Sequence, residues 1–181
     1  DHDGLSLAEF SQRQAMYRDA EIAAMKDVPE FIRKAQEIYG YDHFVNDVGG
    51  SLCELEDDSV IDLLAEHTLI LYIKVTTRDE EDTLIRRAQS DPKPLYYRPA
   101  FLAEHLPIYM AEKGIEFVAQ VEPNDFTRWV VPRLFHSRVP RYEAIAEPHG
   151  YTVTSQEVAQ VKSEADFLAL VETAIARKQG G

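Results

Sequence analysis

Alternation of strand-like and helix-like segments is the feature of this sequence that most restricts its fold. Amphipathic helical patterns fill most of the chain between short apolar runs. Such alternation predicts a single α/β domain, residues 1–181, built around a mainly parallel sheet. The runs with the apolar, β-branched or aromatic character of strands are 43–47, 68–75, 115–121 and 151–158.

Helix ends are marked by residues that satisfy terminal backbone groups. The helix predicted over 28–40 ends in Gly40, a residue type that favours helix C-termini. A second helix is predicted over 58–67. Capping-box spacing, a Ser or Thr followed three residues later by an acidic residue, occurs at Thr77 and at Ser163 and predicts helices after both.

Charge and cysteine content exclude several kinds of partner. The chain has 32 acidic and 19 basic residues, a formal net charge of −13, which repels phosphate backbones and makes nucleic acid and anionic membranes poor partners. The single cysteine, Cys53, excludes an internal disulfide framework and is typical of a reducing compartment. No apolar run approaches the roughly 20 residues of a membrane span. We therefore expect a cytoplasmic protein.

A glycine pair follows the first predicted strand and forms the first candidate site. Ligands gather at the carboxyl ends of parallel strands. Glycine lacks a β-carbon, so backbone N–H groups beside it can reach an anion or a hydroxyl directly. The alternative is a tight turn that needs positive φ. The candidate residues are Asn46, Asp47, Gly49, Gly50 and Ser51.

Basic residues surround a break in the sequence at SDPKP, residues 90–94, where prolines end a helix. Arg86 and Arg87 precede this break, Lys93 lies within it, and Arg98 follows it. A mobile cationic loop could close over transferring phosphates and neutralise developing charge. The alternative is a solvated helix end, where arginines favour the helix dipole.

The two ends of the chain carry further candidates. Pro140 suits the first turn of a helix, and Arg138 just before it could hold a carboxylate bidentately, unless it is an ordinary surface arginine. Asp1 and Asp3 would point the same way in an extended chain, as metal ligands or catalytic bases often do, unless they belong to a flexible acidic terminus. The histidines show no paired ligand spacing, which argues against a zinc site.

Together these elements resemble the shikimate kinase group of P-loop small-molecule kinases in order and approximate spacing. The resemblance covers nearly the whole chain, and its most specific part is RVPRYEAIA, residues 138–146, which matches the family's Arg-x-Pro-x-Tyr-x-x-x-Ala in full. The other matches are Asp1-His2-Asp3 for Asp-x-Asp, Phe31 and Arg33 for a Phe-Arg pair, Gly49-Gly50-Ser51 for Gly-Gly-Gly, and Lys93 to Tyr96 for the lid motif Arg-Pro-Leu-Leu.

The resemblance implies a three-layer α/β/α fold of the P-loop kinase type, with a lid-like segment near 83–99 and a helical insertion near 99–135. It implies ATP and Mg²⁺ as cofactors and transfer of the γ-phosphate to a hydroxyl of a small polar metabolite. The resemblance implies catalytic roles for Asp3, Asp1 and Lys93, and metal binding for Asp1 and Asp47. It implies acceptor binding for Arg33, Gly49, Gly50, Ser51 and Arg138, and phosphate binding for Lys93, Arg86 and Arg87.

One family element does not occur in these 181 residues. The loop Gly-x-x-x-x-Gly-Lys-Ser/Thr cradles the nucleotide phosphates, and in the family it would lie upstream of Asp1. We therefore expect this chain by itself to bind ATP weakly or not at all and to be inactive. Serine at position 51 and lysine at position 93 replace the family's glycine and arginine, which argues against shikimate itself as the acceptor.

Two other functions remain open. One is a kinase-like binding or regulatory module without catalysis, since function does not follow from fold. The other is a phosphatase of the haloacid dehalogenase type, because DHDGLSL faintly resembles that family's Asp-x-Asp-Gly-Thr opening. Thr76 or Thr77 could then serve as the family's Ser/Thr, but the acidic pair Asp57-Asp58 precedes them, which is the wrong order.

Overall fold

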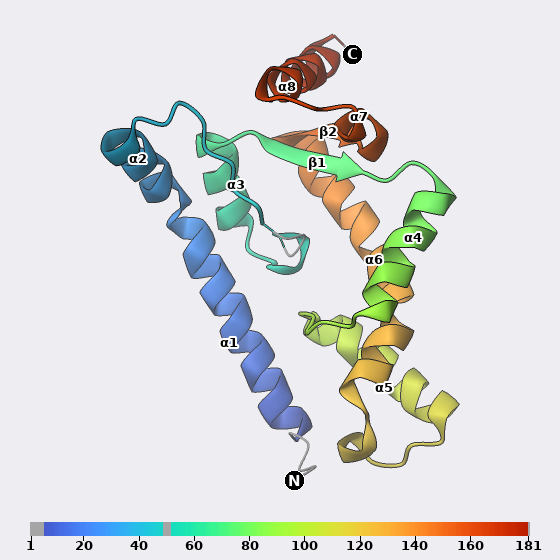
Figure 1. Ribbon diagram of the computed structural model, residues 1–181. Coiled ribbons are helices and arrows are strands. Elements are labelled where there is room, and N and C mark those ends of the chain that lie inside the picture. Colours follow the sequence, from blue (N-terminus) through green and yellow to red (C-terminus); the bar gives the residue numbers. More distant parts are fainter. Residues whose placement is uncertain (1–5, 49–51, 181) are drawn as a thin grey trace.

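Helices dominate the computed structural model, which describes residues 6–48 and 52–180 (Figure 1). None of the helices in these ranges is both long enough and apolar enough to cross a membrane. The elements in chain order are α1 (Leu7–Lys26), α2 (Val28–Tyr39), η1 (Leu52–Glu54), α3 (Asp58–His67), β1 (Ile70–Lys74), α4 (Arg78–Ser90), α5 (Pro99–Lys113), η2 (Val118–Gln120), α6 (Pro123–His149), β2 (Gly150–Thr154), α7 (Ser155–Ala159) and α8 (Glu164–Gln179).

The two strands form a parallel pair whose register runs from Ile70 opposite Gly150 to Lys74 opposite Thr154. The long helix α6 leads directly into β2 and packs against both strands, while α8 packs against β2 (Figure 1). A β-carbon at Gly150 would lie 2.7 Å from the carbonyl oxygen of Ile70, which is too close for any other residue. Glycine at this position therefore lets the first pair of the register approach closely.

The predicted three-layer α/β/α fold is wrong. The structure is mainly helical and contains a two-stranded parallel sheet among its described residues. Runs 68–75 and 151–158 do supply β1 and β2, although the second strand ends at Thr154 and the chain continues as α7. Run 43–47 forms no strand, and run 115–121 contains the short helix η2 and no strand.

The two missing strands have separate physical reasons. In run 43–47 the side chain of Val45 is 79% exposed, so the apolar residues that suggested a strand are not buried against a neighbour. An extended segment becomes a strand only when another backbone pairs with it. In run 115–121 the backbone N–H groups of Glu116 and Phe117 donate to Oε1 of Gln120, at 3.2 and 3.0 Å. These N–H groups therefore stabilise a local turn and do not pair with a neighbouring strand.

The helix predictions that rested on terminal residues are confirmed. Gly40 ends α2 with φ +66°, and α3 spans 58–67 as predicted. Thr77 and Ser163 cap α4 and α8, each accepting a hydrogen bond from the backbone N–H three residues later. Pro140 is a correction, because it lies inside α6 and not in a first turn. Pro132 and Pro148 also lie inside α6, so packing of this helix outweighs the lost backbone hydrogen bonds.

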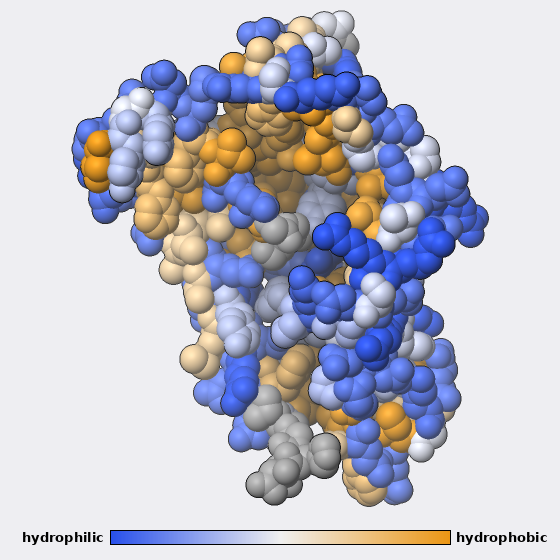
Figure 2. Space-filling model, viewed as in Figure 1, coloured by the Kyte–Doolittle hydropathy of each residue, from blue (hydrophilic) through white to orange (hydrophobic). Residues whose placement is uncertain are grey.

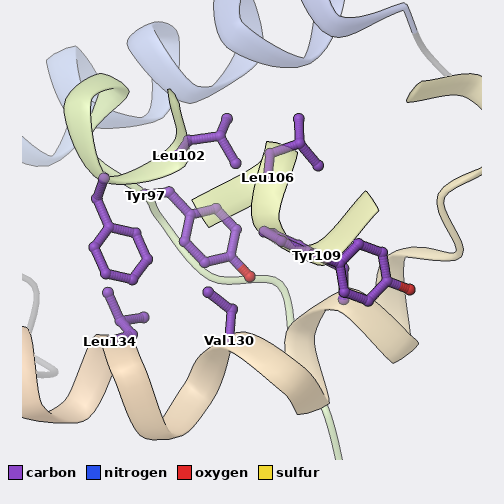
Figure 3. Packing of buried hydrophobic residues seen from close by; sticks show 8 residues of the cluster. Tyr97, Leu102, Leu106, Tyr109, Val130 and Leu134 are labelled. Carbon is purple, nitrogen blue, oxygen red and sulfur yellow. The ribbon is translucent and has the colours of Figure 1, made fainter. Parts of the chain in front are cut away.

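Two hydrophobic clusters contain most of the buried apolar residues in the described part of the chain. The aromatic cluster packs α5 against the first half of α6, and Figure 3 shows the ring of Tyr97 between Leu102 and Leu106 on one side and Val130 on the other. Tyr109 in this cluster donates its hydroxyl to Asp125 at 2.7 Å. The aliphatic cluster joins the start of α2, the segment around η1, and α3. Its buried members are Val28, Leu52, Leu55, Val60, Ile61 and Leu64.

Candidate functional site

A cavity of about 520 Å³ lies between β1, α4 and α6 and is the candidate site. Figure 2 shows apolar side chains gathered in the hollow beneath β1. The walls are mostly apolar because each of the three elements turns its hydrophobic side chains toward the others. Representative wall residues are Tyr72 and Ile73 from β1, Leu84 and Ile85 from α4, and Leu134 and Phe135 from α6.

Polar groups from α4 and α6 also line the cavity. The imidazole Nε2 of His136 lies 2.6 Å from Oε1 of Glu81 and joins α6 to α4. Both residues also border a smaller cavity of about 380 Å³, which lies at the carboxyl end of β1 beside Thr76 and Thr77. The His136–Glu81 pair therefore separates two adjoining spaces and offers a proton donor and acceptor to either.

Tyr142 and Arg138 lie one helical turn apart on α6 and give the cavity further polar groups. The ring of Tyr142 stacks on Tyr72, with centroids 5.4 Å apart. Burial raises the pKa of Tyr142 above its ordinary value, so its phenol stays protonated at neutral pH. Arg138 is half-buried and holds the fixed positive charge of this wall.

Arg138 also belongs to a buried ionic network, which we call the arginine–glutamate cluster. Its centre is the carboxylate of Glu54, which has no solvent exposure. The Nε atoms of Arg98 and Arg138 each donate to one of its oxygens at 2.9 Å. Two charge-assisted hydrogen bonds thus compensate for removing this carboxylate from water. The members of the cluster are Glu54, Glu56, Arg98, Arg138 and Arg141.

The same cluster holds segment 52–56, which follows the glycine pair, in place. Glu56 has φ +54°, an unusual value for a residue with a β-carbon, and its carboxylate accepts from Arg98 and Arg141 at 3.3 and 3.4 Å. Arg141 Nε donates to the carbonyl of Cys53 at 2.9 Å. Segment 52–56 is therefore held against α6 and against the residue that precedes α5.

Around Arg138 the structure brings together its own motif, part of the lid-like segment, and the residues that follow the glycine motif. Segment 52–56 directly follows Gly49-Gly50-Ser51 and supplies Glu54. The lid-like segment supplies the carbonyl of Tyr96, which accepts from Arg138 Nη2 at 3.4 Å, and Leu95, which lines the cavity. The glycine pair with Ser51, and also Asp1 and Asp3, lie outside the described residues.

The other predicted site residues lie away from the cavity walls. Lys93 is exposed, and its ammonium is 3.7 Å from Asp91. Arg86 bonds within its own helix, to the carbonyl of Asp82 and the hydroxyl of Thr83. Arg87 is exposed in the last turn of α4, as expected of an arginine that favours a helix C-terminus.

Arg33 and Asp47 also lie apart from the cavity. Arg33 is exposed on α2 and pairs with Glu30 and Glu37. Asp47 is exposed between α2 and η1. Within residues 6–48 and 52–180, no three His, Cys, Asp or Glu side chains gather as a metal site would require.

The threonines and the acidic pair considered for a phosphatase have structural roles. Thr77 caps α4, and Thr76 precedes it at the rim of the smaller cavity. Asp57 caps α3 and accepts from the backbone N–H of Ser59 at 3.0 Å, while Asp58 begins that helix.

Sequence analysis missed Glu54, Arg141, His136 and Glu81. Glu54 did carry a signal, since it is a lone charge among the apolar residues Leu52, Cys53 and Leu55. A charged side chain inside an apolar run predicts a buried partner of opposite sign. The His136–Glu81 pair, by contrast, links positions 55 residues apart, and no local pattern marks it.

No known protein family, curated protein or solved structure matches this chain. The function is therefore argued from the geometry of the cavity.

Proposed function

We propose that this chain binds a small organic molecule in the cavity between β1, α4 and α6. The observation that carries the proposal is the cavity itself, whose size falls in the range of about 300–1,000 Å³ that is common for ligand sites. Its walls are mostly apolar and it has a few polar groups on one side, which is the usual composition of such sites. The ligand accordingly has an apolar body and one polar end.

The polar end of the ligand faces Arg138 and Tyr142. A guanidinium carries five N–H donors, more than the contacts of Arg138 with Glu54 and Tyr96 use. Tyr142 contributes its stacked ring to the same wall, so the donors offered to the ligand are those that Arg138 has left. A carboxylate, a phosphate or a hydroxyl group suits these donors, so an acidic or hydroxylated metabolite is the expected ligand class.

A more specific candidate is the acceptor site of a small-molecule kinase that uses ATP and Mg²⁺. It is favoured by one observation: Glu54 of segment 52–56 and Tyr96 of the lid-like segment both contact Arg138, which lines the cavity. The cavity would then hold the acceptor, and Lys93, Arg86 and Arg87 would neutralise phosphate charge. Since the 181 residues contain no Gly-x-x-x-x-Gly-Lys-Ser/Thr, we expect no ATP turnover by this chain alone.

A cavity-filling variant tests the binding function. Ala88 lines the cavity, so Ala88→Phe places a ring in the space that the ligand needs. The probe is anilinonaphthalene sulfonate, which combines an aromatic body with an anionic head and fluoresces when it is bound. We expect the affinity of Ala88→Phe for this probe to be about tenfold or more below that of the wild type. The matched control is Ala103→Phe, the same change at an exposed position of α5. Equal binding by both variants would contradict the assignment.

Paired ligands can reject the kinase candidate without rejecting the binding function. The comparison uses small hydroxy acids and the same acids without the hydroxyl, with affinities measured by ligand-observed NMR. A site built to hold a phosphoryl acceptor should prefer the hydroxylated member by about tenfold or more, because its polar groups would otherwise be unpaired. Binding without any such preference would reject the kinase candidate and leave the binding function intact.

A further inference from the structure

The outer edge of β1 is open. β2 pairs with one edge of this strand, and within residues 6–48 and 52–180 no strand pairs with the other. Alternate backbone N–H and C=O groups of a strand point to opposite edges, so half of those in β1 face away from β2. A parallel pair is normally part of a larger sheet, and two strands alone are marginally stable.

Both faces of β1 are apolar next to this edge. Tyr72 stacks on Tyr142 of α6, and Ile70 packs against the aliphatic cluster. Ile73 alternates to the opposite face and is 50% exposed. Exposed edges usually carry charges, prolines or bulges that prevent pairing. Over Ile70–Lys74 the one charge is that of Lys74, which Glu143 neutralises at 2.6 Å.

We propose that the outer edge of β1 binds an extended polypeptide segment of a partner protein as a third strand. The chemistry of the edge determines this occupant, since a row of backbone donors and acceptors is matched in register only by another backbone. Because apolar side chains lie on both faces, the segment is rich in valine and isoleucine and not alternately polar. The chain's charge of −13 favours a segment with basic flanks over one with acidic flanks.

The bound strand would also affect the cavity. Tyr72 and Ile73 belong both to the open edge and to the cavity wall. A strand paired with β1 therefore lies over the cavity and closes part of its open side. This inference does not depend on the cavity having a ligand, and its test is independent of the ligand experiments.

The test uses a short peptide of alternating valine and isoleucine, as long as β1, with lysines at both ends. We expect it to slow hydrogen exchange of the β1 amides by about tenfold or more, because the added ladder protects them. The control peptide has the same side chains but N-methyl groups on alternate backbone amides, which block the ladder. Equal binding of the methylated peptide, or protection confined to other elements, would overturn the proposal.

Variants of the protein complete the test. Ile73→Lys puts a charge at the open edge and should weaken peptide binding about tenfold or more. Ile108→Lys, at an exposed position of α5, is the matched control and should bind as the wild type does. Circular dichroism melting verifies that both variants fold. If the wild type is instead a dimer that Ile73→Lys separates, the occupant is a second copy and the proposal of a partner peptide is wrong.

Discussion

The chain contains two groups of arginines and glutamates that share their chemistry and differ in burial. In the arginine–glutamate cluster, Glu54 is fully buried and meets partners 44 and 84 positions away in the sequence. On α2, Arg33 bridges Glu30 and Glu37, only three and four positions away, and all three side chains are about half exposed. The first group joins distant parts of the fold, whereas the second connects residues on the exposed surface of one helix.

This difference decides what each group contributes. Water solvates the α2 group whether or not the ion pairs form, so each pair contributes little to stability. Glu54 and its arginines have given up that solvation, and each depends on the others for compensation. The buried network therefore need not add much stability over an apolar alternative, but loss of one member is costly. Three changes sharpen this comparison.

The largest effect is expected for Glu54→Gln, which removes the charge and keeps the shape. Arg98 and Arg138 would then share a neutral amide in a buried place. We expect the free energy of unfolding to fall by about 3–5 kcal/mol, as measured by urea denaturation. Glu37→Gln makes the same change in the exposed group and is the control. A loss below about 1 kcal/mol for Glu54→Gln would mean that water or rearrangement solvates the two arginines.

A smaller effect is expected for Arg33→Gln, which breaks both of the pairs that Arg33 forms on α2. The free energy of unfolding should change only slightly, because water solvates these exposed charges when the pairs are broken. Thermal melting at low and high salt is the measurement, and the small difference between variant and wild type should shrink as salt is added. A loss comparable with that of Glu54→Gln would show that burial does not separate the two groups.

The smallest effect concerns protonation of Glu30. Hydrogen bonds from Arg33, and then from Lys34, lower its pKa from 4.5 to about 2. Its contribution to stability is therefore present above about pH 4.5 and is lost as the pH falls from there through about 2. Carbon-13 NMR titration of the Glu30 carboxyl checks the value. In Arg33→Gln the titration midpoint of Glu30 should rise toward 4.5. An unchanged midpoint would mean that Arg33 does not cause the lowered pKa.

Sequence patterns predicted the local features of this fold and missed the long-range ones. Gly40, Thr77 and Ser163 act within their own helix ends, so four-residue patterns sufficed to place these ends. Run 43–47 has strand-like residues as 68–75 does, but only the second finds a partner backbone. Since pairing is a property of two segments, composition of one segment could not decide between them.

The same limit applies to the candidate site. Arg138 was expected from its motif and does line the cavity. Its partner Glu54 was hidden among 32 acidic residues, whose wide distribution suggested solubility alone. Its apolar neighbours in the sequence suggest burial, but its arginine partners lie on other elements and only the fold identifies them. The cavity likewise arises from the packing of three elements, and no single run of sequence describes it.

The location of Cys53 has a practical consequence. This thiol directly precedes Glu54, is only 4% exposed, and is the one cysteine in the chain. Burial raises its pKa, so little reactive thiolate exists at neutral pH. A maleimide or similar reagent can therefore react with the chain at one position. It reaches this thiol only when the surrounding segment opens to solvent. The rate of labelling therefore reports how often this part of the protein opens locally.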